Sequence, residues 1–170
     1  VTRNADVANG AGDASTFNSQ EGVLFAEISA LADDISLRHI TLGDGSSSNA
    51  VSIRYDNPNI ITLYLNSGGA SQASFTASVQ TLSFNKCLIK YKQNDFSAWV
   101  NGFQVGVTDT VGIVFPSGTL DRINFDIGYG LQDFYGNTKQ LMTFKEALTD
   151  AELENLTSWD SFIELAQGQQ

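Results

Sequence analysis

The sequence predicts an all-β protein, a two-sheet antiparallel β-sandwich with one short helix near its C-terminus. Short runs in which apolar and polar residues alternate at period two recur along the chain, separated by Gly, Asn and Asp. This spacing is typical of antiparallel sandwiches. Helix-start signals are confined to residues 149–157. A length of 170 residues with 42% hydrophobic content suits a single domain with a substantial core.

About ten strands are expected from these runs. The expected strands are 22–28, 36–42, 51–55, 60–65, 74–79, 86–92, a hairpin over 96–107, 120–128 and 138–144. The hairpin is the strongest of these signals, because the Asn101-Gly102 pair suits a type I′ turn, which needs positive φ at both central residues. In 120–128 the apolar side chains fall on one face and the polar ones on the other.

A short helix is expected at about 150–157. Thr149 and Glu152 have the spacing of a capping box, and Leu148 with Leu153 has the spacing of a hydrophobic staple. The apolar side chains of the helix should then seat on the edge of the sandwich. These side chains are Leu153, Leu156 and Trp159.

The domain organisation is predicted to be simple. Residues 1–20 are rich in Asn, Ala, Gly, Ser and Asp and should form a segment that packs on the domain. Residues 21–163 should form the sandwich, and 164–170 a polar tail. Because the chain begins with Val, we expect it to be a piece of a longer polypeptide.

Charge and composition exclude several classes of partner. Nine Lys and Arg against nineteen Asp and Glu give a net charge of −10, which disfavours nucleic acid and anionic lipid. No run approaches the roughly 20 apolar residues that a membrane-spanning helix needs, so membrane insertion is not expected. The single cysteine, Cys87, alternates with lysines at period two, which indicates a core thiol, and it cannot form an internal disulfide.

Several segments together resemble the laminin-G-like and concanavalin A-like lectin-glucanase domains found in phage and prophage structural proteins, often at the ends of tail fibres. The segments are VTRNAD (1–6), EGVLFAEISAL (21–31), ITLGDG (40–45), KYKQNDFSAWVNG (90–102), FYG (134–136) and ALTDAEL (147–153). They span nearly the whole chain. The resemblance implies a jelly-roll sandwich with a binding or architectural role, and it supplies no catalytic set.

The loop at residues 126–137 is the most site-like stretch of the sequence. Its glycines allow tight bends, its tyrosines offer flat faces for a sugar ring, and its carboxylates and amide offer oxygens. The candidate ligand-binding residues in it are Asp126, Tyr129, Asp133, Tyr135 and Asn137. A solvated connecting loop and a Ca²⁺ site are the alternatives, but the spacing matches no diagnostic calcium motif, so no cofactor is predicted.

Trp99 is the remaining ligand-binding candidate. It alternates with Ala98 and Val100, so it should point outward if that pair faces the core. An outward Trp99 could stack on a sugar, or it could pack beneath a crossing segment or a neighbouring subunit.

Enzymatic readings of this fold find little support in the sequence. The paired carboxylates of sandwich glucanases are missing, since Glu21 and Glu27 are six residues apart and flank a structural apolar run. A polysaccharide lyase would need Arg, Gln, His and Tyr together on one sheet. The only histidine, His39, is expected to be an exposed strand residue, because Ile40 and Leu42 claim the inward face. No catalytic residue and no enzyme activity are therefore predicted.

These observations favour a non-catalytic carbohydrate-binding or adhesion module, a domain of a phage or prophage fibre-like protein that recognises cell-surface glycans. The expected location is the virion or the extracellular surface, and the expected partner is a glycan or polysaccharide, neutral or calcium-bridged because the chain is acidic. A structural or homo-oligomerisation module of a virion or tail is the first alternative. A polysaccharide lyase or glycosidase of the same fold is the second.

Overall fold

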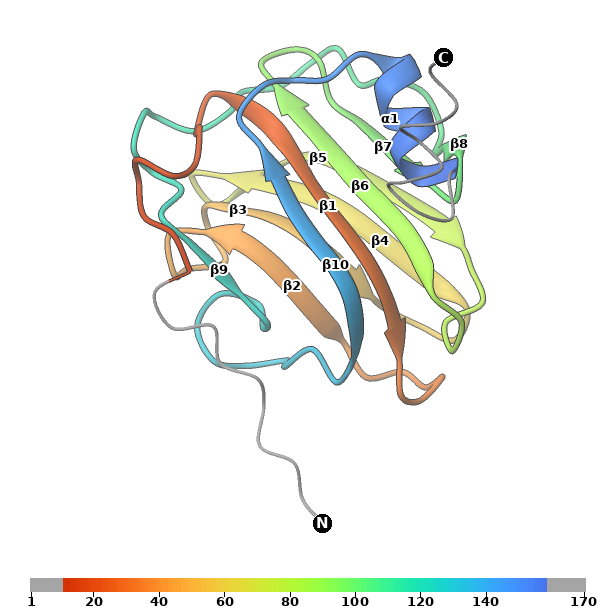
Figure 1. Cartoon of the computed structure of the whole chain (residues 1–170). Helices are drawn as coiled ribbons and strands as arrows, with labels where there is room; N and C mark the ends of the chain where they lie inside the picture. Colours follow the sequence, from red (N-terminus) through yellow and green to blue (C-terminus); the bar gives the residue numbers. More distant parts are fainter. Residues whose placement is uncertain (1–10, 159–170) are drawn as a thin grey trace.

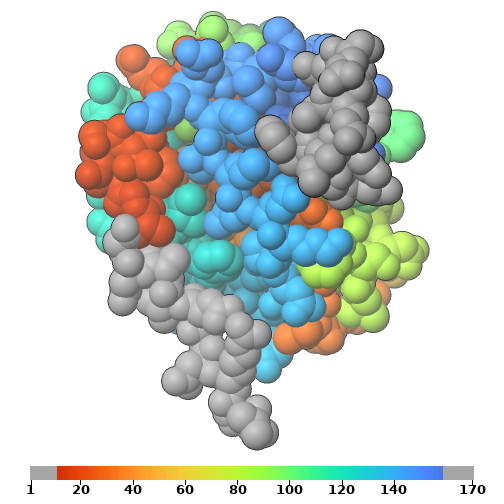
Figure 2. Space-filling model, in the orientation of Figure 1, coloured from red at the N-terminus to blue at the C-terminus, as the bar shows by residue number. Residues whose placement is uncertain are grey.

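A computed structural model describes residues 11–158, which form two antiparallel five-stranded sheets packed face to face (Figure 1). Sheet A has the strand order β10 (Gly136–Phe144), β1 (Glu21–Ala30), β6 (Asn85–Lys92), β7 (Ser97–Val100) and β8 (Phe103–Gln104). Sheet B has the order β5 (Ala70–Ser78), β4 (Ile60–Ser67), β3 (Ala50–Tyr55), β2 (Arg38–Gly43) and β9 (Arg122–Asn124). The predicted all-β sandwich is confirmed. In space filling, side chains of β10 lie across the front of the molecule (Figure 2).

The core lies between the two sheets and is built from every second residue of each strand. Leu24 and Ile28 of β1 and Ile53 of β3 are completely buried there. Each such side chain contributes about 2 kcal/mol through the apolar surface it removes from water. Polar residues at the intervening positions of β3 face the other way, as the period-two pattern predicts.

Polar atoms that enter the core have partners. The Tyr55 hydroxyl donates to the carbonyl of Ile28 at 2.9 Å, and the Cys87 thiol lies 3.2 Å from the carbonyl of Ala26. Burial raises the pKa of Cys87, so the thiol stays protonated. The prediction of an apolar core thiol is confirmed.

The strand predictions hold with one correction. The turn residues Asn101 and Gly102 have φ values of 50° and 85°, as a type I′ hairpin requires. The strand expected over 120–128 is wrong beyond Asn124, where pairing with β2 ends. There the chain turns back on itself: the N–H of Phe134 donates to the carbonyl of Phe125 at 2.7 Å.

The helix α1 (Asp150–Ser158) covers part of the outer face of sheet A (Figure 1). Its start matches the predicted cap, because the Glu152 carboxylate accepts the N–H of Thr149 at 2.8 Å and its hydroxyl at 2.7 Å. Leu153 is fully buried and packs in an apolar cluster with Phe25, Leu88 and Trp99. The predicted Trp159 and the tail at 164–170 lie outside the described residues.

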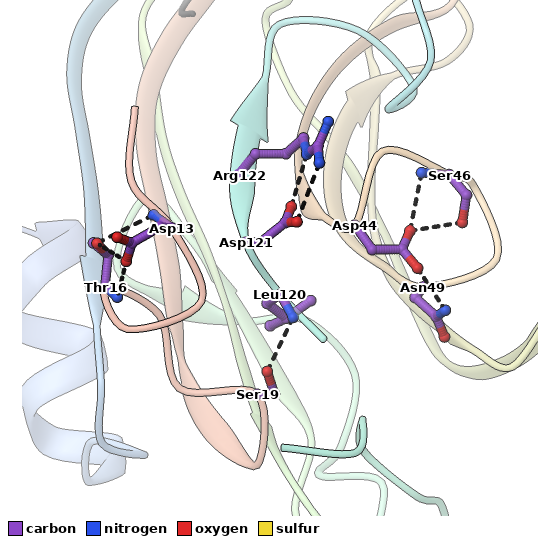
Figure 3. A network of polar contacts seen from close by, with 9 residues as sticks. All are labelled: Asp13, Thr16, Ser19, Asp44, Ser46, Asn49, Leu120, Asp121 and Arg122. Atoms are coloured by element: carbon purple, nitrogen blue, oxygen red, sulfur yellow. Dashed lines mark hydrogen bonds and ion pairs between the residues drawn. The ribbon is translucent and has the colours of Figure 1, made fainter. Parts of the chain in front are cut away.

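Residues 11–20 run against the sandwich. Phe17 is 7% exposed and joins the core cluster. The Tyr91 hydroxyl donates to the carbonyl of Asn18 at 2.7 Å, and the Ser19 hydroxyl accepts the N–H of Leu120 at 3.0 Å (Figure 3). The remainder of the segment expected to pack on the domain lies outside the described residues. Within the described chain, no helix has the length and apolar character needed to cross a membrane.

Replacing Leu153 with Ala tests whether α1 stabilises the domain by packing on the outer face of sheet A. The substitution should lower the free energy of unfolding by about 2–4 kcal/mol, because it leaves a cavity over Trp99 and Leu88. Urea denaturation followed by circular dichroism measures the change. Leu82→Ala is the matched control, since Leu82 is 61% exposed and should cost less than about 0.5 kcal/mol. Equal effects of the two substitutions would contradict the role assigned to α1.

Candidate functional site

The outer face of sheet B is polar, whereas the outer face of sheet A carries an apolar cluster that includes Phe25, Leu88 and Trp99. Because Ile53 and Leu63 point into the core, the residues between them in β3 and β4 point outward. The outward side chains of sheet B include His39, Thr41, Ser52, Arg54, Thr62, Tyr64, Ser74 and Thr76. Of these, His39, Thr41, Ser52, Thr62 and Tyr64 are at most 9% exposed, so the open part lies around Arg54, Ser74 and Thr76. We refer to this surface as the polar face.

Arg54 is the centre of the polar face. Its Nη2 lies 2.8 Å from Oδ2 of Asp56, and its guanidinium carbon lies 5.2 Å from the ring centroid of Tyr64. Thr62 donates its hydroxyl to the same Asp56 oxygen at 3.3 Å. The Arg54 and Asp56 side chains are 27% and 23% exposed, so both can reach solvent while their geometry is fixed. A charged donor and a charged acceptor are therefore held side by side on a flat surface.

His39 lies on the polar face but is fully buried, which corrects the prediction of an exposed strand histidine. The predicted orientation of the His39 side chain, away from the core, is confirmed, since Ile40 and Leu42 do face the core. Tyr64 accounts for part of the burial: its hydroxyl is 3.3 Å from His39 Nδ1, and its ring meets the imidazole edge-on. Burial and the nearby Arg54 charge lower the pKa of His39 to about 4, so the ring is neutral at pH 7.

The loop of residues 125–135, which connects β9 to β10, borders the polar face along β2. Asn124 is paired with Thr41, and the chain beyond it reaches the turn that follows β2, where a Cβ on Gly128 would lie 3.1 Å from the Ser46 carbonyl oxygen. The loop then returns, and the carbonyl of Gln132 accepts the N–H of His39 at 3.3 Å. The loop therefore contacts the chain beside both ends of β2.

The turn after β2, which this loop contacts, is stabilised by the carboxylate of Asp44. Asp44 accepts the N–H of Ser46 at 2.9 Å and its hydroxyl at 2.7 Å, and its second oxygen accepts the Asn49 amide at 2.8 Å (Figure 3). Gly128 meets this turn with φ of 114°, a conformation that residues with a Cβ rarely adopt. The glycine seen in the sequence thus allows the close approach of the loop to the turn.

The structure divides the predicted loop residues between two places. Asp126 stands near His39, whose pKa its charge acts to raise, and its side chain accepts the N–H of Gly128. Tyr129 follows directly and is 52% exposed. Tyr135 is also 52% exposed, but its carbonyl accepts the N–H of Leu31 at the end of β1.

The two remaining predicted residues of the loop are Asp133 and Asn137. Asn137 lies in β10 of sheet A, where its amide is 3.3 Å from the Ser29 hydroxyl. Asp133 is exposed between the two groups. Asp126 therefore lies near the polar face, and Tyr129 follows Gly128 at the turn after β2, whereas Tyr135 and Asn137 lie toward sheet A.

Trp99 does not lie on the polar face. It points out of sheet A, as the alternation with Ala98 and Val100 predicted, but it is 7% exposed in the cluster beneath α1. Of the two interpretations left open for it, packing beneath a crossing segment agrees with this position, and sugar stacking does not. Trp99 is therefore left out of the candidate site.

The sequence analysis did not identify the residues at the centre of the polar face. A signal for Arg54 was present, because the apolar alternation of β3 placed it on the solvent side. The outward position of Tyr64 was not evident, because the run 60–65 is apolar except for Thr62 and Tyr64 and contains no charged residue that would indicate its outer face. Among residues 11–158, no group of three or more His, Cys, Asp or Glu could hold a metal ion.

A separate groove of about 480 Å³ lies at one end of the sandwich. It is lined by neutral residues only, among them Gln20, Asn49 and Gln93 with Ile113 and Pro116. Most of its hydroxyl and amide groups already bond to the backbone, as when Ser67 donates to the carbonyl of Val114 at 3.0 Å. The polar face therefore remains the stronger candidate.

No protein-family model matches the sequence. The search of curated proteins also finds no match. Solved structures do match. The CBM40 of the Ruminococcus gnavus IT-sialidase bound to α2,3-sialyllactose has a TM-score of 0.70 at 14% identity, covering 92% of this chain and 96% of that one.

Two further solved structures share the fold. Domain 4 of a GH43 extracellular arabinanase from Geobacillus stearothermophilus, in complex with arabinotriose, has a TM-score of 0.66 at 12% identity, covering 92% of this chain and 82% of that one. The heptameric SAP-like pentraxin of Limulus polyphemus has a TM-score of 0.66 at 13% identity, covering 90% and 75%. At these identities the likeness establishes a concanavalin A-like jelly-roll fold.

The buried His39 should make stability depend on pH. Its pKa is about 4 in the folded chain against 6.5 for an unperturbed imidazole, so the unfolded chain binds more protons between these values. The free energy of unfolding should therefore rise with pH from 4 to 6.5, with about 3 kcal/mol of the rise due to His39. Urea denaturation at a series of pH values measures it, and His39→Gln should remove this component. A variant as pH-dependent as the parent would contradict the assignment.

Proposed function

We propose that the chain is a non-catalytic carbohydrate-binding module and that the polar face of sheet B is its binding surface. The observation that carries the proposal is Arg54, held by Asp56 and stacked on Tyr64 on a partly open surface. Neighbouring hydroxyls of a sugar act as donor and acceptor together, and a fixed guanidinium beside a fixed carboxylate offers the complementary pair. Because both groups are already positioned, binding would cost little side-chain entropy.

The similar structures support a sugar ligand without defining it. One of them is bound to sialyllactose and another to arabinotriose, so domains of this fold present saccharide sites. Fold alone does not transfer a ligand, and the polar face supplies the independent argument.

A neutral saccharide fits this chain better than an anionic one. The Arg54 charge is balanced by Asp56, so the pair has no net charge to offer a carboxylate or sulfate. The whole chain carries −10, which disfavours the approach of a polyanion. We therefore propose an uncharged stretch of a glycan or polysaccharide as the ligand.

The loop beside the polar face is proposed to complete the site. Asp126, whose charge acts on His39, and the exposed Tyr129 are proposed to contact a ligand that extends from Arg54 toward β2. Asp133, Tyr135 and Asn137 are proposed as outer contacts for a longer chain. Their distribution toward sheet A makes them secondary to Arg54.

The biological setting is proposed from the sequence resemblance. The sequence resembles laminin-G-like domains of phage and prophage fibre-like proteins, and on that basis the module is proposed to act on the virion or at the cell surface as an adhesin that binds cell-surface glycans. A purely structural role in a virion or tail is the alternative, and it requires no sugar at the polar face.

A polysaccharide lyase is kept as a second candidate because of one observation. His39, Arg54 and Tyr64 lie together on one sheet face, which gives three of the four residue types, Arg, Gln, His and Tyr, that a polysaccharide lyase of this fold would need. However, His39 is fully buried and Tyr64 is 9% exposed. A proton-transferring group must reach the sugar within hydrogen-bond distance, so this arrangement favours binding over catalysis.

Replacing Arg54 with Met tests the binding proposal. A glycan array, read with and without Ca²⁺, first identifies a ligand, and calorimetry then compares the variants. Arg54→Met should weaken binding about tenfold or more, because a charged hydrogen bond contributes about 1.5–3 kcal/mol. Lys92→Met is the control, since Lys92 is a cation paired with Glu21 on sheet A, away from the polar face, and it should bind normally. No array signal, or equal losses in both variants, would reject the proposed site.

Product analysis separates the module from a lyase. Incubation with uronate polysaccharides should produce no unsaturated sugar and no new reducing ends, because His39 is enclosed. Ultraviolet absorbance and a reducing-sugar assay measure the two products. Turnover that disappears in His39→Gln would establish the lyase and overturn the binding-module proposal.

A further inference from the structure

One side of the sandwich is almost free of charge. From residue 57 to 85 the sequence contains no Asp, Glu, Lys, Arg or His, and from 102 to 120 the only charged residue is Asp109. The first stretch includes β4 and β5, and the second includes β8 and the irregular segment after it. In a chain with nine basic and nineteen acidic residues, two such stretches on neighbouring elements are unusual.

The two stretches meet in space. The N–H of Ile113 donates to Oε1 of Gln72 in β5 at 3.1 Å. A groove of about 450 Å³ separates Ser74 and Thr76 of β5 from residues 105–110. We call β5 together with residues 103–113 the uncharged side.

Large apolar side chains project from the uncharged side. Phe103 is 77% exposed, Val107 81%, Val111 77% and Ile113 55%. The carboxylate of Asp109 among them accepts the N–H of Val111 at 3.0 Å, so the one charge is held within its own loop. Contiguous exposed apolar residues of this kind mark interaction surfaces.

The uncharged side also contains one edge of each sheet. β5 ends sheet B and β8 ends sheet A. Natural edge strands usually carry charges, prolines or bulges that prevent pairing with another chain. The opposite edges follow this rule, since β10 carries Lys139 and β9 carries Arg122. The nine residues of β5 contain neither a charge nor a proline, and the one irregularity is a register shift against β4 at Gln72.

We propose that the uncharged side is a contact surface between two copies of this chain. Each copy carries −10, so two copies repel each other least where charge is sparse, and on this side Asp109 is the one charged residue. A basic partner would instead select an acidic surface. A second copy presents the same uncharged side, and a two-fold axis matches that surface to itself.

The inference does not rest on sugar binding. β5 is the edge strand of sheet B, so its Ser74 and Thr76 border both surfaces, and residues 103–113 begin with β8 of sheet A. Arg54 and Asp56, which carry the binding proposal, come from β3 and the residue after it. Dimerisation and glycan binding can therefore fail independently, and each has its own experiment.

Sedimentation velocity of the full chain, from low to high micromolar concentration, tests the proposal. A monomer–dimer equilibrium should appear, and added NaCl should strengthen it, because salt screens the repulsion between two acidic bodies. An ionic interface would weaken with salt. A monomer at every concentration and salt level, or a dimer that salt dissociates, would overturn the proposal.

Charge insertion locates the surface. Val107→Glu and Val111→Glu should each raise the dimer dissociation constant about tenfold or more, because an unpaired carboxylate would be buried at the contact. Ile35→Glu is the matched control, since Ile35 is 79% exposed and outside the uncharged side, and it should leave the dissociation constant unchanged. Thermal unfolding confirms that all three variants fold, as expected at exposed positions. Equal weakening by Ile35→Glu, or none by the two valine variants, would overturn the placement.

Discussion

The structure depends on the burial of two apolar sheet faces against each other. Side chains alternate between the two faces of a strand, so the residues that fill the core also determine which residues face outward. Ile53 in the core sets Arg54 on the polar face, and Leu63 does the same for Tyr64. A shift of one residue in the register of β3 would expose its apolar side chains and bury Arg54.

The outer faces of the two sheets differ in polarity and in what covers them. On sheet A the outward residues Phe25, Leu88 and Trp99 are apolar, and α1 covers them. Lys90 reinforces that cover, because its ammonium lies 2.8 Å from Asp95 and 3.6 Å from Asp150 in the first turn of the helix. On sheet B no helix of the described chain lies over the polar face, the surface proposed for binding.

The fold was predictable from the sequence, because alternation and turn residues are local signals. The type I′ turn at Asn101, the cap at Thr149 and the core position of Cys87 all follow from neighbouring residues. The burial of His39 was not predictable, since it depends on Tyr64 from β4 and on a loop that returns from a distant part of the chain. The end of β9 at Asn124 has the same origin. Apolar alternation continues past it, but the glycines that follow direct the chain to Ser46.

The single thiol has a practical consequence. Cys87 is enclosed between the sheets and its pKa is raised, so alkylating reagents should not modify it in the folded chain. A cysteine introduced at an exposed position, such as Ser117, would then be the only reactive one. A fluorophore or a solid support could be attached there at one defined point, with the native sulfur atom left in place.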